Sequence, residues 1–306
     1  FDTKVYLRYY RSEDPMSYIR QEKIFYLLSK LCWTLQIPDV AYIAIVTAII
    51  SILSAITYYL AFENKLEYLC IAYLTMFCFP YSIMMFINVM RQGIAVFSLL
   101  LGIMLLDRGK KVLALVVSVF GCLFHYMGFV LLIAFLVYYL CNKRELLLWG
   151  SLGMCVVGVI VGFSGLGKKI LSCFPSNALT VRVLCYLDVE ITKVALLKLC
   201  FYLAICSALV FLIVKFRVEL TNLYKMLVIF TITGVGTSCI VVAQRFSISL
   251  DVMLPLLFLN QPMLEQIKEV RGERMCKLYV GGFFVLALGM FLFGMVSNPV
   301  KANMGF

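Results

Sequence analysis

The sequence predicts an all-α polytopic integral membrane protein with about ten helices that span the bilayer fully or in part. Of its 306 residues, 63% are hydrophobic and 14% are charged, against roughly 45–50% and 25% in soluble domains. The mean hydropathy is +1.00, and so few polar residues cannot cover a water-soluble core of this size. A soluble enzyme, a secreted disulfide scaffold and a disordered chain are therefore excluded.

Long apolar runs predict the spanning helices, since a helix needs about 17–25 apolar residues to cross the bilayer. Runs that reach or approach this length cover residues 40–62, 66–87, 91–106, 146–163, 194–214, 226–243 and 278–296. The block 112–141 lies between two basic turns, and we expect it to enter and return as a hairpin with His125 at its tip. The run 246–260, entered through Arg245, is also short. Short arms are stable where they line a water-filled cavity, so we expect an outward-facing cavity.

Segment 1–39 is predicted to be an amphipathic, extracytoplasmic segment rather than a crossing. Its apolar residues recur at the spacing of one helix face, as expected of a helix that lies in the membrane interface. The stripe consists of Ile24, Leu27, Leu28, Leu31 and Leu35.

Lysine and arginine residues in short loops predict the orientation in the membrane. The short basic segments are 63–67, 107–111, 142–145, 215–225 and 261–277. Placing them in the cytoplasm puts 1–39, loop 164–193 and the C-terminus outside. The net charge of +11 then reflects topology and anionic lipid rather than nucleic acid. We expect a single membrane domain over 1–306, with helix groups at 40–163 and 194–306, and a further helix before residue 1.

Arg91 is an ionisable residue at the start of an apolar run, where such groups are costly and usually functional. Asn88, Gln92 and Ala95 share its helix face, and the small alanine permits close approach of a neighbour. Arg91 either binds an anionic substrate, or extends to the interface, or pairs with a buried carboxylate.

Arg245 follows Gln244 at the start of the run 246–260, with Ser249 one turn later on the same face. Arg91 and Arg245 both fall at outer ends of crossings, and together they could clamp a phosphate. Extension of each side chain to the interface is the alternative. His125, the single histidine, acts either as a general base or as a structural hydrogen-bond donor. With one histidine and no C-x-x-C motif, neither a metal site nor a cofactor is expected.

These motifs together resemble the EpsG family of Wzy-like polymerases of exopolysaccharide, capsule or O-antigen. The central signature is Arg91-Gln92-x-x-Ala95, a basic turn at 107–111, and then His125. Asp2 to Tyr6, Glu22 to Leu28, and Gln244-Arg245-Phe246 through Pro255 are similar to the family's other conserved stretches. Met127 departs from the pattern, because the family usually has a small hydroxyl residue there.

The resemblance implies transfer of a growing glycan from undecaprenyl pyrophosphate onto the next lipid-linked repeat unit. This occurs at the outer face of the bacterial cytoplasmic (inner) membrane, in a GT-C-like fold, without metal or cofactor. The expected partners are these lipid-linked oligosaccharides, membrane lipid, a flippase and a chain-length regulator, with no nucleic acid.

The resemblance also suggests roles for the site residues. Arg91 and Arg245 would hold the pyrophosphate, and His125, Glu22 or Asp2 would be the base. Further substrate contacts would come from Asn88, Gln92, Gln244, Tyr6 and Tyr10, although interfacial anchoring explains the tyrosines equally well.

Two other functions stay open from the sequence. A flippase or transporter of lipid-linked oligosaccharide would also need cations in a cavity, but should show internal symmetry. A membrane O-acyltransferase that modifies the polymer would use one histidine as base, and would not change polymer length.

Overall fold

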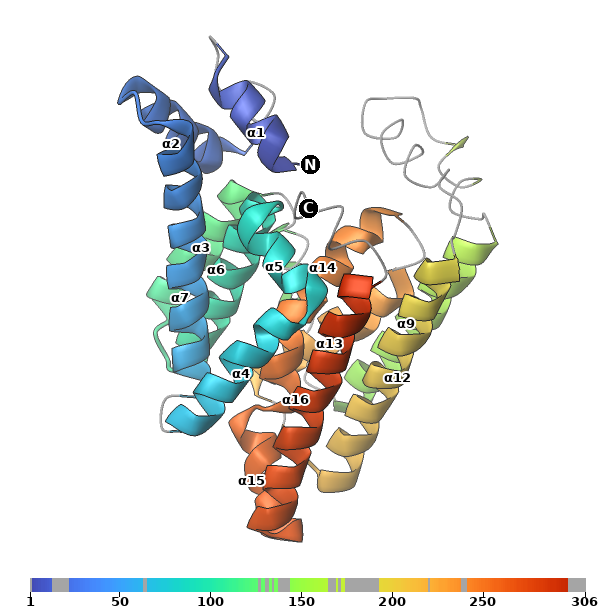
Figure 1. Ribbon diagram of the computed structural model, residues 1–306. Coiled ribbons are helices and arrows are strands. Elements are labelled where there is room, and N and C mark those ends of the chain that lie inside the picture. The colour runs from blue at the N-terminus through green and yellow to red at the C-terminus, as the bar shows by residue number, and fades with distance from the viewer. Residues whose placement is uncertain are drawn as a thin grey trace.

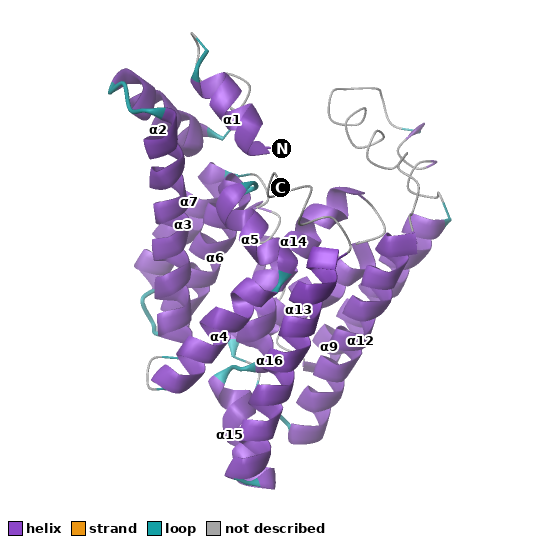
Figure 2. Cartoon of the chain, viewed as in Figure 1, coloured by secondary structure: helices purple, strands orange, loops and turns teal. Residues whose placement is uncertain are grey.

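The computed structural model describes residues 2–12, 22–62, 65–125, 128–129, 132–133, 135–136, 144–164, 169, 172–173, 193–219, 221–237 and 241–296. Within these residues every regular element is a helix, and most helices lie side by side in one bundle (Figures 1 and 2). The bundle helices are α3 (Asp39–Ala61), α4 (Leu66–Cys78), α5 (Pro80–Ile87), α6 (Met90–Asp107), α7 (Lys111–Phe124), α9 (Arg144–Phe163), α12 (Lys193–Phe216), α13 (Asn222–Thr237), α14 (Val241–Phe258) and α16 (Glu273–Val296). The predicted all-α membrane fold is confirmed.

The central helix of the bundle is α6, which is almost entirely buried and contacts α3, α5, α7 and α13. In the described part of the chain, α3, α6 and α16 are long and apolar enough to cross a membrane. Only 28% and 22% of the spanning residues of α3 and α16 are buried, against 83% in α6, and many of their exposed residues are apolar. Exposed apolar helix faces are what a lipid environment requires.

The prediction of one continuous helix over 66–87 was wrong. The helix is interrupted at Phe79, between α4 and α5. Phe79 has an extended conformation, with φ −82° and ψ 128°, directly before Pro80. Proline disfavours the helical conformation of the residue before it, and its own missing N–H is tolerated in the first turn of a new helix.

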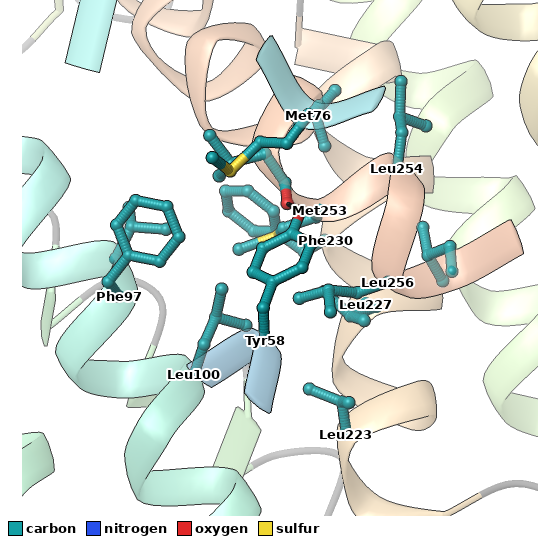
Figure 3. Close-up of a cluster of buried hydrophobic side chains, with 14 of the residues drawn as sticks. Tyr58, Met76, Phe97, Leu100, Leu223, Leu227, Phe230, Met253, Leu254 and Leu256 are labelled. Atoms are coloured by element: carbon teal, nitrogen blue, oxygen red, sulfur yellow. Dashed lines mark hydrogen bonds between the residues drawn. The ribbon is translucent and has the colours of Figure 1, made fainter. Parts of the chain in front are cut away.

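The boundary between the predicted runs 226–243 and 246–260 was also misplaced. Helix α13 ends at Thr237, and α14 already begins at Val241. The 18 residues of α14 correspond to about 27 Å of helix, nearly a full crossing. Figure 3 shows a cluster of buried side chains in which Met253, Leu254 and Leu256 of α14 lie near Tyr58 of α3. The Tyr58 hydroxyl donates to the carbonyl oxygen of Val252 at 2.8 Å.

The predicted loop 261–277 instead contains a helix, α15 (Gln261–Arg271). Asn260 Oδ1 accepts a hydrogen bond from the Met263 backbone N–H, and Gly272 ends the helix with φ 84°. These are ordinary cap residues, so the sequence does contain the signal for this helix.

Segment 1–39 forms α1 (Asp2–Tyr10) and α2 (Lys23–Thr34) at one end of the bundle (Figure 1). Phe25, Ser29 and Cys32 are the buried face of α2. Leu27 and Leu31 of the predicted stripe are exposed, so no protein covers this apolar face in the described structure. That arrangement fits an interfacial helix.

The described residues of the short basic segments lie at the opposite end of the bundle, where α15 also lies (Figure 1). Lys65 forms an ion pair with Glu265 at 2.9 Å, which joins segment 63–67 to segment 261–277. The Leu223 backbone N–H donates to Asp107 at 3.4 Å, which joins 215–225 to 107–111. Most of loop 164–193, the second arm of 112–141 and the C-terminus lie outside the described residues. The side of the membrane, the division into helix groups, the GT-C-like arrangement and the outward cavity stay predictions.

Candidate functional site

The antiparallel pair α6 and α7 packs through small residues. A Cβ added to Gly121 would lie 2.6 Å from Ser98 Cβ and 3.0 Å from the Ala95 carbonyl oxygen. One added to Gly102 would lie 3.0 Å from the Ala114 carbonyl oxygen. Small residues let membrane helices approach this closely, as we expected for Ala95. The packing therefore fixes the register between the two helices.

This register brings Arg91 and His125 to the same end of the pair. Arg91 lies one turn before Ala95, and His125 one turn after Gly121. Helix α7 ends at Phe124, and His125 is extended, with φ −156° and ψ 135°. A Cβ added to Gly128 would lie 2.8 Å from Cys122 Cα, so the chain folds back onto α7 after His125. His125 thus stands at a chain reversal, as predicted.

Glu22, directly before α2, connects these two residues. Its Oε2 forms an ion pair with Arg91 Nη1, and its Oε1 lies 3.4 Å from His125 Nε2. The carboxylate makes no cap hydrogen bond to α2. Glu22 and His125 are buried, and Arg91 is nearly so. We call Arg91, Glu22 and His125 the Glu22 cluster. Pairing with a buried carboxylate was one of the three alternatives for Arg91, and Glu22 is that carboxylate.

Aromatic rings surround the guanidinium of Arg91. Its Nε donates to the Tyr6 hydroxyl at 3.1 Å, and its Cζ lies 5.1 Å from the centre of the Tyr6 ring. The Phe25 ring is 5.8 Å away. Such contacts between cations and rings are stabilising, more so away from water. Helix α1 therefore covers the cation through Tyr6.

Tyr10 belongs to a different contact. Its hydroxyl donates to the Ile37 carbonyl oxygen at 2.8 Å, and its ring stacks on Tyr42 with the centres 4.2 Å apart. Burial, together with the nearby Cys32 and Asp39, raises the pKa of the Tyr10 hydroxyl. Tyr10 therefore holds α1 to the start of α3 and does not contact the Glu22 cluster through these interactions.

The other predicted residues are placed as follows. Asn88 Oδ1 accepts from the Thr3 backbone N–H at 3.4 Å, which holds α1 against the end of α5. Gln92 Nε2 donates to Ser249 Oγ of α14 at 2.8 Å. Asp2 lies on α1, and Gln244 and Arg245 lie on α14, but their side chains are outside the described residues.

Two features of this region were missed from the sequence. Phe25 belongs to the stretch Glu22 to Leu28 that resembles the family, but its place beside the Arg91 guanidinium was not predicted. The Tyr202 hydroxyl donates to Asp251 Oδ1 at 2.5 Å, and both residues are buried. A carboxylate inside an apolar run was the signal for Asp251, but its partner on α12 was not predictable. Among the described residues, no three His, Cys, Asp or Glu side chains gather to hold a metal ion.

Comparison with known protein families gives a match over the given sequence. The model of the EpsG family matches residues 1–306, a range that includes the Glu22 cluster and the arginine-bearing start of α14. No curated protein and no solved structure matches the chain significantly.

Proposed function

Because the chain belongs to the EpsG family, whose membership points to exopolysaccharide biosynthesis, we propose that it is the polysaccharide polymerase of such a pathway. It moves a growing glycan from undecaprenyl pyrophosphate onto the next lipid-linked repeat unit. The observation that carries this proposal is the Glu22 cluster, where a buried cation, a carboxylate and an imidazole meet at one end of the bundle.

The reaction makes two demands on the protein. A bond forms between the anomeric carbon of the donor glycan and a hydroxyl oxygen of the acceptor sugar. The bond from that carbon to the pyrophosphate oxygen breaks, and the hydroxyl proton must leave. The pyrophosphate therefore needs fixed positive charge as it departs, and the hydroxyl needs a base within reach.

Arg91 meets the first demand. A guanidinium pairs with phosphate oxygens in bidentate geometry and keeps its charge at any physiological pH. It has five N–H donors, so it can contact a phosphate and a carboxylate at the same time. An unpaired charge in this buried place would be costly, and the ion pair with Glu22 keeps the cation in position before substrate arrives.

His125 and Glu22 together meet the second demand. The contact between His125 Nε2 and Glu22 Oε1 orients the imidazole, as a carboxylate does in a catalytic triad. Nδ1 is then the nitrogen that accepts the proton of the attacking hydroxyl. Asp2 on α1 is the other carboxylate that the family resemblance indicates as a base.

The remaining assignments complete the proposal. The second phosphate is held by Arg245 of α14, with Gln244, Asn88 and Gln92 as further polar contacts. Tyr6 contributes a ring on which a sugar can stack.

We assign the end of the bundle that carries α1 and α2 to the outer face of the bacterial inner membrane. Support comes from the separation of this end from the basic segments, which favour the cytoplasm. A flippase would supply the substrate, and a chain-length regulator would act on the product.

A reconstituted reaction tests the function. The lipid-linked repeat unit is extracted from a strain that lacks this protein and added to proteoliposomes containing the purified chain. The proposal expects a ladder of products on a gel, each longer by one repeat. Movement of the lipid across the bilayer without elongation would identify a flippase, and labelled acyl transfer at constant length would identify an acyltransferase. Either result would overturn the proposal.

A further inference from the structure

Among the described residues, α14 receives buried polar contacts from three neighbouring helices within about one turn. The partners come from α6, α12 and α3. The contacts are those of Gln92 with Ser249 at 2.8 Å, Tyr202 with Asp251 at 2.5 Å, and Tyr58 with the Val252 carbonyl at 2.8 Å. We call Ser249, Asp251 and Val252, with these partners, the α14 collar.

Every side chain that makes these contacts is buried. A carboxylate at this depth is costly and is retained where it has a task. The oxygen–oxygen distance of 2.5 Å between Tyr202 and Asp251 is at the short end for hydrogen bonds, as expected for an O–H donor to a carboxylate. The collar is therefore a fixed point in the apolar bundle.

Pro255 explains why α14 needs such a fixed point. Proline has no N–H to donate to the carbonyl of residue 251, and its ring presses against that carbonyl. A helix interrupted in this way bends, and the direction of the part before the proline is then set by contacts with neighbouring helices. In α14 that part carries Arg245, and the collar supplies the contacts.

The collar also links the two arginine-bearing helices directly. Gln92 follows Arg91 in α6, and Ser249 lies one turn after Arg245 on the same face of α14. Both helices run from the end that carries the Glu22 cluster toward the end that carries α15 (Figure 1). The hydrogen bond between Gln92 and Ser249 thus fixes the position of residue 245 along the bundle axis relative to Arg91.

We propose that Ser249 and Asp251 are positioning residues that set the separation of Arg91 and Arg245, so that each guanidinium meets one phosphate of the substrate pyrophosphate. This inference rests on the proposed function. It assigns a role to two residues that do not themselves contact substrate.

The first test measures the geometry. Nitroxide labels are introduced as an encoded non-natural amino acid at position 119 of α7 and position 241 of α14, and their separation is measured by pulsed electron spin resonance. Ser249→Ala and Tyr202→Phe should shift and broaden the distance distribution. Tyr279→Phe is the matched control, because its hydroxyl donates to the Phe258 carbonyl at 2.9 Å at the other end of α14. Distributions that stay as in the wild type for both collar variants would overturn the proposal.

The second test measures binding of undecaprenyl pyrophosphate to the full chain in nanodiscs. Ser249→Ala should weaken binding about tenfold, the usual effect of one lost buried hydrogen bond. In an Arg245→Ala background it should have no further effect, because residues that act through one another are not additive. Equal losses in both backgrounds would contradict the proposal. Asp251→Asn keeps an acceptor oxygen for Tyr202 and should bind close to wild type, whereas Asp251→Leu should not.

The two proposals can fail separately. Binding and distances that behave as described, without any polymer, would refute the proposed function and leave the positioning role intact. Normal polymerisation with unchanged distance and affinity in Ser249→Ala would refute the positioning role alone.

Discussion

The two ends of the helix bundle use the same kinds of charged residue in different ways. At one end, the side chains of Arg91 and Glu22 are 12% and 8% exposed, and they pair with each other beneath α1. At the other end, the side chains of Lys65 and Glu265 are 32% and 53% exposed. Ion pairs in water contribute little, whereas buried charges in a membrane protein are expensive and mark functional sites. Under the proposed function, burial rather than charge therefore separates the residues assigned to the reaction from those assigned to topology.

Loss of Arg91 should have the largest effect. Arg91→Ala leaves Glu22 buried without its cation, which typically costs about 3–5 kcal/mol of stability. The double variant Arg91→Ala with Glu22→Gln removes both charges and should remain folded. Its rate of chain elongation in proteoliposomes should fall by at least about 10²-fold, the usual cost of removing one transition-state donor.

Arg108 at the other end of the same helix is the matched control. Its guanidinium donates to backbone carbonyl oxygens, including that of Met104 at 3.2 Å, and it lies far from the Glu22 cluster. Arg108→Ala should give the wild-type product ladder. A wild-type product ladder from the double variant of Arg91 and Glu22 would show that Arg91 is no more important for elongation than Arg108.

Neutralising the carboxylate alone should have a smaller effect. Glu22→Gln keeps the shape of the side chain and one acceptor oxygen, but weakens the contacts with Arg91 and His125. Hydrogen bonds to charged groups are worth about 1.5–3 kcal/mol, so elongation should fall by about 10–100-fold. Glu265→Gln, at the exposed end, should elongate at the wild-type rate. If both variants behave alike in a side-by-side assay, the orienting role of Glu22 is wrong.

The packing between α6 and α7 should tolerate no added methyl group. Gly121→Ala places a Cβ 2.6 Å from Ser98 Cβ, and overpacking of this kind costs about 1–3 kcal/mol. The melting temperature in detergent should fall, and elongation with it, because Arg91 and His125 lose their register. Gly150→Ala on α9, where an added Cβ meets nothing within 4 Å, should melt no lower than the wild type. Equal melting of both variants would contradict the packing account.

The exposed pair should have the smallest effect, and one that depends on pH. The hydrogen bond from Lys65 lowers the pKa of Glu265. The pair therefore stabilises the fold above the ordinary glutamate pKa, and this contribution is lost as the pH falls through the lowered value. Lys65→Ala should cost less than about 1 kcal/mol at pH 7, and nothing in acid, by thermal unfolding. A larger loss, or one that grows in acid, would show that this end is not merely a solvated surface.

Much of the helical fold was predictable from apolar runs, and the errors have local causes. The runs behind α3, α6, α9, α12 and α16 were found nearly at their observed bounds. The run 66–87 was joined across Pro80 because its hydropathy does not fall there. The helix α15 was taken for a loop because topology was inferred from its charges, while its Asn260 and Gly272 caps were not weighed.

The site was predictable in its residues but not in its contacts. Arg91 and His125 are ionisable groups in apolar runs, and the small residues of α6 hinted at the close packing that brings them together. Their link through Glu22, which lies 69 positions before Arg91, was not predictable. The amphipathic pattern of segment 1–39 indicates an interfacial helix but not which bundle helix it contacts. Likewise, Ser249 was noted as a neighbour of Arg245, but its bond to Gln92 on another helix depends on tertiary packing.

One structure would test the central claim most directly. A cryo-electron microscopy map of the protein with undecaprenyl pyrophosphate should show where the pyrophosphate lies. The account predicts phosphate oxygens within hydrogen-bonding distance of the Arg91 guanidinium, beside Glu22 and His125. A pyrophosphate bound among Lys65, Arg108 and the other exposed basic residues at the α15 end would contradict it.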